Sequence, residues 1–172
     1  VQDGAADEFA RKLADAMGAL KLGPGLDRDS DVGPVINEAA RDEIAGLVDG
    51  SVAGGASVLT GGSAPARPGW FYEPTVLSRV DADDDILDHE VFGPVAPVVR
   101  FADEDEAVTL ANDTEFGLAA YVYSGDLARG LRVGEAIEAG IVGINRGFVS
   151  DPAAPFGGMK QSGLGREGAH DG

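Results

Sequence analysis

The chain contains no cysteine, and it has few basic residues for its 172-residue length. Without cysteine it has no disulfide, no thiolate ligand for a metal and no cysteine nucleophile of its own. Lysine and arginine number 13 against 30 acidic residues, which gives a net charge of −17. Nucleic acids and anionic membranes bind to clustered basic residues, so this balance argues against both as partners.

No apolar run approaches the length that crosses a bilayer, and no signal peptide is recognisable, so we expect a cytoplasmic protein. The first residue is Val1 rather than methionine, which indicates that the chain is part of a longer polypeptide. Its length suits one domain that buries a sizeable core.

Helical and strand-like patterns alternate along the chain. We expect helices over residues 7–20, 34–53, 103–112 and 126–139, and strands over residues 56–60, 71–76, 95–101, 117–123 and 141–144. In the first helix, the predicted buried stripe is Phe9, Leu13, Met17 and Leu20, and in the last helix Leu127, Leu131 and Ile137 are predicted to face inward. This alternation predicts an α/β fold with a mostly parallel sheet and flanking helices.

A glycine-rich stretch, residues 155–168, follows the last expected strand. Its composition also suits a flexible tail, but the bulky Phe156 and Leu164 among the glycines favour an ordered loop that wraps one mouth of the domain. Ligands of such folds bind beyond the carboxyl ends of the strands. We therefore look for chemistry after Ile144 and around Glu90.

Glu90 and Phe92 lie in the segment before the strand at 95–101. A carboxylate there is suited to accept hydrogen bonds from the two hydroxyls of a ribose, and a phenyl ring two residues on is suited to contact a flat heteroaromatic ring. The alternative is a surface glutamate followed by a core phenylalanine.

Ser150 and Phe156 form the second candidate pair. Ser150 is suited to donate a hydrogen bond to a polar or anionic substrate group, and Phe156 to line an apolar funnel. The alternative is that Ser150 caps a turn and Phe156 fills the core. His89 and His170 have no chelating spacing, so we expect no metal site.

Five motifs occur in order along nearly the whole chain. They are GPVIN at 33–37, EVFGP at 90–94, ANDTEFGLA at 111–119, GIVGIN at 140–145 and PFGG at 155–158, the last followed by Lys160, Ser162 and Gly163. This series resembles the aldehyde dehydrogenase superfamily. VSD at 149–151 and LGREG at 164–168 are most similar to its succinate-semialdehyde dehydrogenases.

The resemblance implies a role for each candidate residue. Glu90 would bind the nicotinamide ribose of NAD or NADP, and Phe92 would contact the nicotinamide ring. Ser150 would help to hold the distal carboxylate of a small aldehyde, and Phe156 would line the aldehyde tunnel. Arg146 lies near that loop without matching a family motif.

The resemblance also implies what lies elsewhere. Residues 1–172 correspond to a carboxyl-terminal portion holding most of the catalytic domain, while the nucleophilic cysteine, the cofactor domain and the terminal oligomerisation strand lie outside it. No catalytic residue is therefore expected within the chain, which alone should be inactive, and the full-length enzyme is expected to be a homo-oligomer. The alternatives are a non-catalytic relic or assembly module, and an aldehyde dehydrogenase of different specificity.

Overall fold

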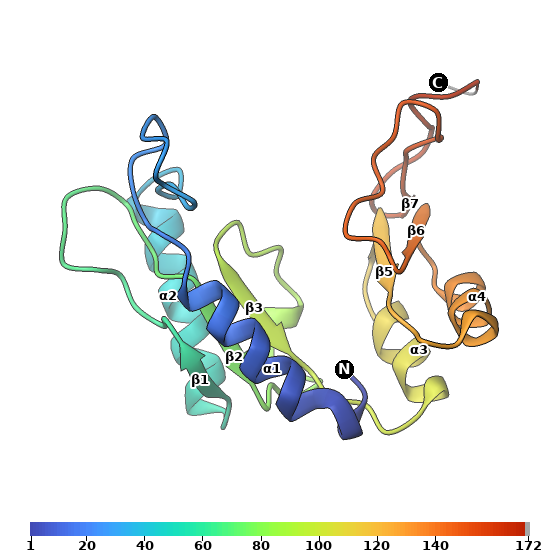
Figure 1. The fold of residues 1–172 in the computed structure, drawn as a ribbon, viewed down its shortest axis with the longest axis horizontal. Helices are drawn as coiled ribbons and strands as arrows, with labels where there is room; N and C mark the ends of the chain where they lie inside the picture. The colour runs from blue at the N-terminus through green and yellow to red at the C-terminus, as the bar shows by residue number, and fades with distance from the viewer. Residues whose placement is uncertain (171–172) are drawn as a thin grey trace. The chain divides into compact units, whose positions relative to one another are not determined.

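The computed structural model describes residues 1–170, which form parts of two compact units, Val1–Ala102 and Asp103–Gly172 (Figure 1). The first unit comprises α1 (Asp3–Gly18), α2 (Glu38–Ala53), β1 (Ser57–Thr60), β2 (Thr75–Ser78), the 3-10 helix η1 (Asp85–Leu87) and β3 (Val95–Val98). Its sheet has the order β1-β2-β3, with β1 antiparallel and β3 parallel to β2.

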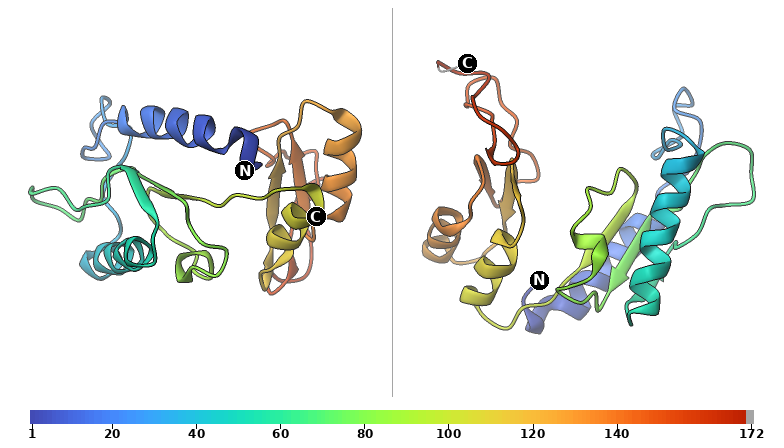
Figure 2. Two further views of the ribbon diagram at one scale, coloured as in Figure 1. Left: turned by 90° about the horizontal axis from the view of Figure 1, so that it is seen from below. Right: turned by 180° about the vertical axis from the view of Figure 1, so that it is seen from behind.

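The central strand β2 is apolar on both faces because a helix covers each side of the sheet. In Figure 2 (left), the strands of this unit lie between α1 and α2. Val76 packs with Ala10, Ala14 and Val98 on the α1 side, while the adjacent Leu77 joins the cluster on the α2 side. Successive side chains of a strand point to opposite faces, so one strand serves both cores. Burying a side chain such as Leu77 contributes about 1.5–3 kcal/mol.

The buried stripe of α1 differs from the predicted one. Ala6, Ala10 and Ala14 are buried, whereas Phe9 is 46% exposed and Leu20 lies beyond the helix. Residues four apart share a helix face, and small alanines bring α1 close to the sheet. Leu13 and Met17 flank this stripe and pack against the cluster.

Two further boundaries in the first unit are also shifted. The strand expected at 71–76 begins only at Thr75, because Pro74 has no N–H to donate and Thr75 N donates to the Pro94 carbonyl oxygen (2.8 Å). The helix expected from residue 34 begins after Asn37, whose side chain accepts a hydrogen bond from Ala40 N and caps α2.

The second unit comprises α3 (Glu104–Asn112), β4 (Phe116–Gly117), β5 (Ala119–Val122), α4 (Leu127–Ala136), β6 (Ile141–Ile144) and β7 (Met159–Lys160). β5 and β6 are parallel, and the short β4 and β7 are antiparallel. The predicted α/β class is confirmed. The described residues form three small sheets, in which two strand pairs are parallel and two are antiparallel. One mostly parallel sheet was expected.

Glycines bring α4 onto β6. Added Cβ atoms at Gly130 and Gly134 would lie 3.2 and 3.3 Å from the Ile144 side chain, so these positions face the strand closely. Leu127 and Leu131, predicted to face inward, are instead 68% and 48% exposed. The helix turns its small residues to the strand, which leaves the leucines on its outer side.

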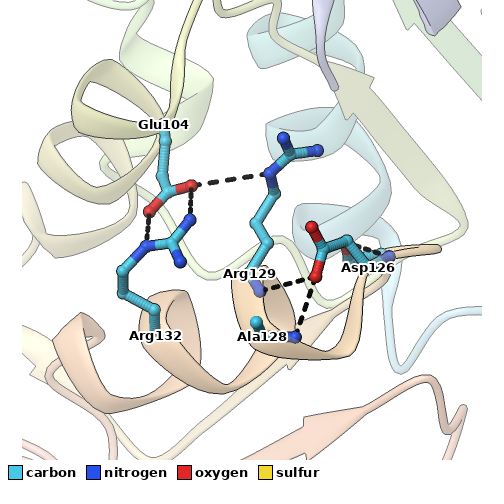
Figure 3. Close-up of polar contacts among 6 residues, drawn as sticks. Glu104, Asp126, Ala128, Arg129 and Arg132 are labelled. Carbon is cyan, nitrogen blue, oxygen red and sulfur yellow. Dashed lines mark hydrogen bonds and ion pairs between the residues drawn. The ribbon is translucent and has the colours of Figure 1, made fainter.

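Charged side chains join the start of α3 to α4 (Figure 3). Both carboxylate oxygens of Glu104 accept hydrogen bonds from Arg132, at 2.6 and 2.7 Å, and Arg129 approaches to 3.5 Å. The bond from Arg132 lowers the pKa of Glu104. Asp126 caps α4 by accepting hydrogen bonds from Ala128 N and Arg129 N, and these bonds lower its pKa.

Within the described part of the chain, no helix is both long enough and apolar enough to cross a membrane.

Candidate functional site

Glu90 and Phe92 are exposed on either side of a residue that is anchored in the first unit. Val91 packs against the core cluster beneath α2, whereas Phe92 is 75% exposed and Glu90 is also exposed. Within residues 1–170, the Glu90 carboxylate takes part in no hydrogen bond or ion pair. The alternative of a core phenylalanine at position 92 is therefore wrong, and both side chains are available to a ligand.

The backbone after Phe92 is held closely against α2. A Cβ at Gly93 would overlap the end of the Ile44 side chain, so glycine allows this close approach without a shift of that side chain. Gly93 N donates to the Val91 carbonyl oxygen (2.8 Å), and Pro94 then accepts the bond from Thr75 that opens the pairing of β2 with β3. The exposed pair is thus carried on a fixed backbone at the entrance to β3.

Asn145 fixes the carboxyl end of β6 in the second unit. Its side-chain oxygen accepts a hydrogen bond from Ser124 N (3.0 Å), and its side-chain nitrogen donates to the Ser124 carbonyl oxygen (2.9 Å). Its own backbone has φ of 52°, a left-handed conformation that asparagine tolerates better than most residues. The ends of β5 and β6 are therefore tied together where the chain turns towards Ser150.

The segment after Asn145 returns over β6 and borders a partly open pocket. An added Cβ at Gly143 would lie 2.5 Å from Val149, so the returning segment packs directly on the strand. The pocket has a volume of about 330 Å³ and is bounded by the whole of β6 and by residues of this segment. The lining residues are Ile141, Val142, Gly143, Ile144, Arg146, Phe148, Val149, Ser150, Asp151, Ala153 and Ala154.

The pocket has a mixed lining of aliphatic residues and three polar side chains. Arg146, Ser150 and Asp151 lie among aliphatic residues and the ring of Phe148, which is 67% exposed. An apolar pocket with a few convergent polar groups is the usual form of a small-molecule site. This one suits a short aliphatic ligand that carries a polar end group.

The glycine-rich stretch is an ordered loop, as predicted. Phe156 and Glu167 exchange two backbone hydrogen bonds of 2.8 Å, which closes the loop on itself. β7 pairs with β4, and Gly117 N donates to the Ser162 side-chain oxygen (3.0 Å). A Cβ at Gly140 would overlap the Gly157 carbonyl oxygen, so this loop passes against the start of β6.

The four predicted site residues are divided between the units. Glu90 and Phe92 belong to the first unit, while Ser150 and Phe156 belong to the second. Ser150 lies in the pocket, and Phe156, which is half-buried, is not among the residues that line it. The sequence analysis did not predict that Phe148 lines the pocket. Its position between Asn145 and Ser150, just after the carboxyl end of a predicted strand, was the one sequence feature that pointed to it.

Among residues 1–170, no group of three or more histidine or carboxylate side chains lies close enough together to hold a metal ion. His89 is engaged locally, since its Nδ1 lies 2.9 Å from the Asp85 carbonyl oxygen, and this bond raises the pKa of His89.

Comparison with known proteins gives one consistent result. A succinate-semialdehyde dehydrogenase from Paenarthrobacter nicotinovorans is 56% identical over 172 residues, which are 100% of this chain and 38% of that protein. A 3-sulfolactaldehyde dehydrogenase from Pseudomonas putida is 48% identical over 172 residues, again 100% of this chain and 35% of the relative. The chain thus spans little more than a third of the length of these relatives.

A solved structure matches equally well. The crystal structure of an E. coli NADP-dependent enzyme superposes with a TM-score of 0.95 at 51% identity, over 99% of this chain and 36% of the other. The sequence profile of the aldehyde dehydrogenase family matches residues 1–172. The chain therefore belongs to the aldehyde dehydrogenase family.

Proposed function

We propose that this chain is part of the catalytic domain of an NAD(P)-dependent aldehyde dehydrogenase that oxidises succinate semialdehyde to succinate. The observation that carries the proposal is the position of Ser150 in an apolar pocket beside β6. A hydroxyl in such a pocket donates a hydrogen bond to the distal carboxylate, while the aliphatic lining accommodates the short carbon chain. The name of the relative from Paenarthrobacter nicotinovorans favours the same substrate.

Glu90 and Phe92 fit the nicotinamide cofactor. Both are exposed, and the Glu90 carboxylate has no competing partner within residues 1–170. The carboxylate is suited to the two ribose hydroxyls, and the Phe92 ring to the face of the nicotinamide. When bound, the cofactor accepts the hydride that leaves the aldehyde carbon. The matched E. coli enzyme is NADP-dependent, and the proposal includes either NAD or NADP.

The reactive sulfur must come from outside this chain, because the chain has no cysteine. In the complete polypeptide, a cysteine thiolate from another segment would add to the aldehyde carbon, and bound NAD(P) would supply the acceptor for the hydride that this adduct must lose to become a thioester, which water would then hydrolyse to the acid and the free thiol. The 172 residues contribute the wall that holds the substrate and part of the cofactor site. Phe156 does not line the pocket beside β6, and its proposed role is to line the aldehyde tunnel elsewhere on the same unit.

The requirement for an external nucleophile is tested by mixing the purified chain with cofactor and succinate semialdehyde and following reduced nicotinamide. No turnover is expected from the chain alone, whereas the complete polypeptide should be active. Sustained turnover by the isolated chain would contradict the assignment of the nucleophile to another segment.

Ser150→Ala in the complete polypeptide tests the substrate role. The loss of a hydrogen bond to a charged group should raise KM for succinate semialdehyde about tenfold and leave KM for butanal, a neutral aldehyde of the same length, nearly unchanged. Thr109→Ala is the matched control, since within residues 1–170 that exposed hydroxyl bonds only to the Asp105 carbonyl oxygen in its own helix. Equal effects on both substrates would argue against the carboxylate role.

Two other functions have specific support. The relative named for 3-sulfolactaldehyde makes that anionic aldehyde a second candidate substrate. The larger kcat/KM of the complete polypeptide, measured with each of the two aldehydes, identifies the preferred substrate. The lack of cysteine favours a non-catalytic binding or assembly module. A genomic sequence that encodes the cysteine segment in the same reading frame would support the enzyme over that module.

A further inference from the structure

The pocket beside β6 is lined by one basic residue, Arg146. Arg146 lines it together with Ser150, four residues further along the same segment. Within residues 1–170, the Arg146 guanidinium makes no hydrogen bond or ion pair. An unpaired guanidinium on a residue that lines a pocket is suited to bind an anionic group of a ligand.

The other basic side chains described in the second unit all have partners. They are Arg129 and Arg132, which contact Glu104, Lys160, which contacts Glu138, and Arg166, which donates to the carbonyl oxygens of Gly158 and Gly165. Arg146 is therefore the one described basic residue of this unit that is available to a ligand. Because Arg146 lines the pocket, a ligand bound there is within reach of its positive charge.

The backbone that carries Arg146 is held in place by its predecessor. Asn145 bonds through both side-chain atoms to the backbone of Ser124, so the turn at the end of β6 is fixed on β5. Val149 then packs on Gly143, which anchors the far side of the same segment. Arg146 and Ser150 are thus carried by a short segment that is fixed at two points.

Asp151 opposes this role because its carboxylate also lines the pocket. Asp151 Oδ1 accepts a hydrogen bond from Ala153 N (2.9 Å), and its backbone oxygen accepts one from Ala154 N, so the residue is engaged in a turn. A carboxylate beside the site and a net charge of −17 both repel an anionic ligand. A pocket that accepts such a ligand consequently needs a nearby cation.

We propose that Arg146 is a specificity-determining residue that selects aldehydes bearing a distal acid group, a carboxylate or a sulfonate. The guanidinium pairs with the acid group while the Ser150 hydroxyl donates a second hydrogen bond to it. This inference rests on the proposed function, since it names the residue that sets the substrate class at the same site.

The test uses the complete polypeptide with Arg146→Gln and Arg146→Lys. Arg146→Gln should lower kcat/KM for succinate semialdehyde at least about tenfold, mostly through KM, with little change for butanal. Arg146→Lys should retain most of the preference, because it keeps the charge. Added salt should reduce the wild-type preference and have little effect on Arg146→Gln.

Arg28→Gln is the matched control, because Arg28 has no polar partner within residues 1–170 and lies in the loop between α1 and α2. It should leave the substrate preference unchanged. A wild-type enzyme that prefers butanal would overturn the proposed function and this inference with it. A wild-type preference for the acidic aldehyde that Arg146→Gln leaves intact would overturn this inference alone. Melting curves of each variant establish that a lost preference occurs in a folded protein.

Discussion

Tyr72 is a polar residue enclosed in the core of the first unit. It is 1% exposed within the cluster beneath α2, and its hydroxyl has no hydrogen-bond partner in the described residues. Burial raises the pKa of Tyr72 to about 12, with smaller contributions from the charges of Asp49 and Glu73. An unpaired buried hydroxyl costs about 1–3 kcal/mol, so the ring stabilises this core while its oxygen opposes folding.

Tyr72→Phe should therefore unfold at the same or a higher denaturant concentration at neutral pH. The wild type should lose stability as pH rises from 10 towards 12, because the unfolded chain ionises Tyr72 near 10 and the folded protein only near 12. Stability from this residue is fully present below pH 10, and the variant lacks the alkaline loss. Denaturant curves across that range measure the difference.

Tyr123→Phe is the control for this prediction, because Tyr123 is 68% exposed and should show no such difference. A Tyr72→Phe variant that is clearly less stable at neutral pH would indicate that the hydroxyl has a partner, such as a buried water.

Gly140 is required for the contact between the glycine-rich loop and the start of β6. A Cβ at this position would overlap the Gly157 carbonyl oxygen, which is backbone and unable to rotate away. Gly140→Ala should destabilise the second unit by about 1–3 kcal/mol. Gly125→Ala should cost much less, since nothing lies within 4 Å of its added Cβ. Amide exchange in β5 and β6 would report both effects, and equal protection in the two variants would contradict this prediction.

At the level of elements, Lys160 joins β7 to the end of α3 and to the residues that follow α3 and α4. Its Nζ donates to the carbonyl oxygens of Asn112 (2.8 Å) and Thr114 (3.1 Å), and it pairs with Glu138 at 2.7 Å. Asn112 in turn donates to the Ala136 carbonyl oxygen and accepts from Glu138 N. The C-terminal end of α3 is therefore linked to the end of α4 and the residues just after it by both the Lys160 ammonium group and the Asn112 side chain.

Lys160→Met should release the loop, because two carbonyl oxygens and a carboxylate lose their donor. We expect a loss of about 1–3 kcal/mol in the stability of the second unit and faster exchange of the Gln161 amide, which donates to the Glu115 carbonyl oxygen. The control is Gln161→Met, whose exposed side chain makes no polar contact among the described residues. If Lys160→Met exchanged no faster than this control, Lys160 would not be the residue that holds the loop.

Periodicity predicted the order and type of the main helices and strands, but it did not predict which faces they bury. In α1, the large residue Phe9 was taken as buried, whereas the helix packs through Ala6, Ala10 and Ala14. In α4, glycines face the strand and Leu131 faces outward. Hydrophobic patterns weight large side chains, while close packing against a sheet favours small ones.

The candidate site was predictable where a residue's role depends on local sequence. The exposure of Glu90 and the ordered loop at 155–168 follow from motifs that lie along the chain. The pocket was not predictable in the same way, because it forms where the segment after Asn145 returns over β6. Arg146 lines that pocket because the chain makes a left-handed turn at Asn145 and brings Val149 back onto Gly143. Neither the turn nor this contact is visible in the sequence pattern.

Across the whole molecule, buried apolar side chains are unevenly distributed between the two units. Within residues 1–170, Val122 is the one buried hydrophobic residue of the second unit, while α1 of the first unit contributes three and α2 and β2 contribute two each. The second unit relies instead on backbone pairing, side-chain hydrogen bonds and close glycine contacts. Its exposed large apolar residues are Phe116, Leu118, Tyr121, Tyr123, Leu127, Leu131, Phe148, Met159 and Leu164.

Exposed apolar surface of this extent should cause the isolated chain to self-associate, because burying it between copies removes it from water. The outer face of α4 is the clearest test, since Leu127 and Leu131 are one turn apart and 68% and 48% exposed. Replacing both by glutamine, a good helix former, should raise the concentration at which light scattering detects oligomers about tenfold, with the fold retained. Leu26→Gln is the control for an isolated exposed leucine. A wild-type chain that stays monomeric with a single sharp melting transition would contradict this prediction, because its apolar surface would then be stable in water without a second copy.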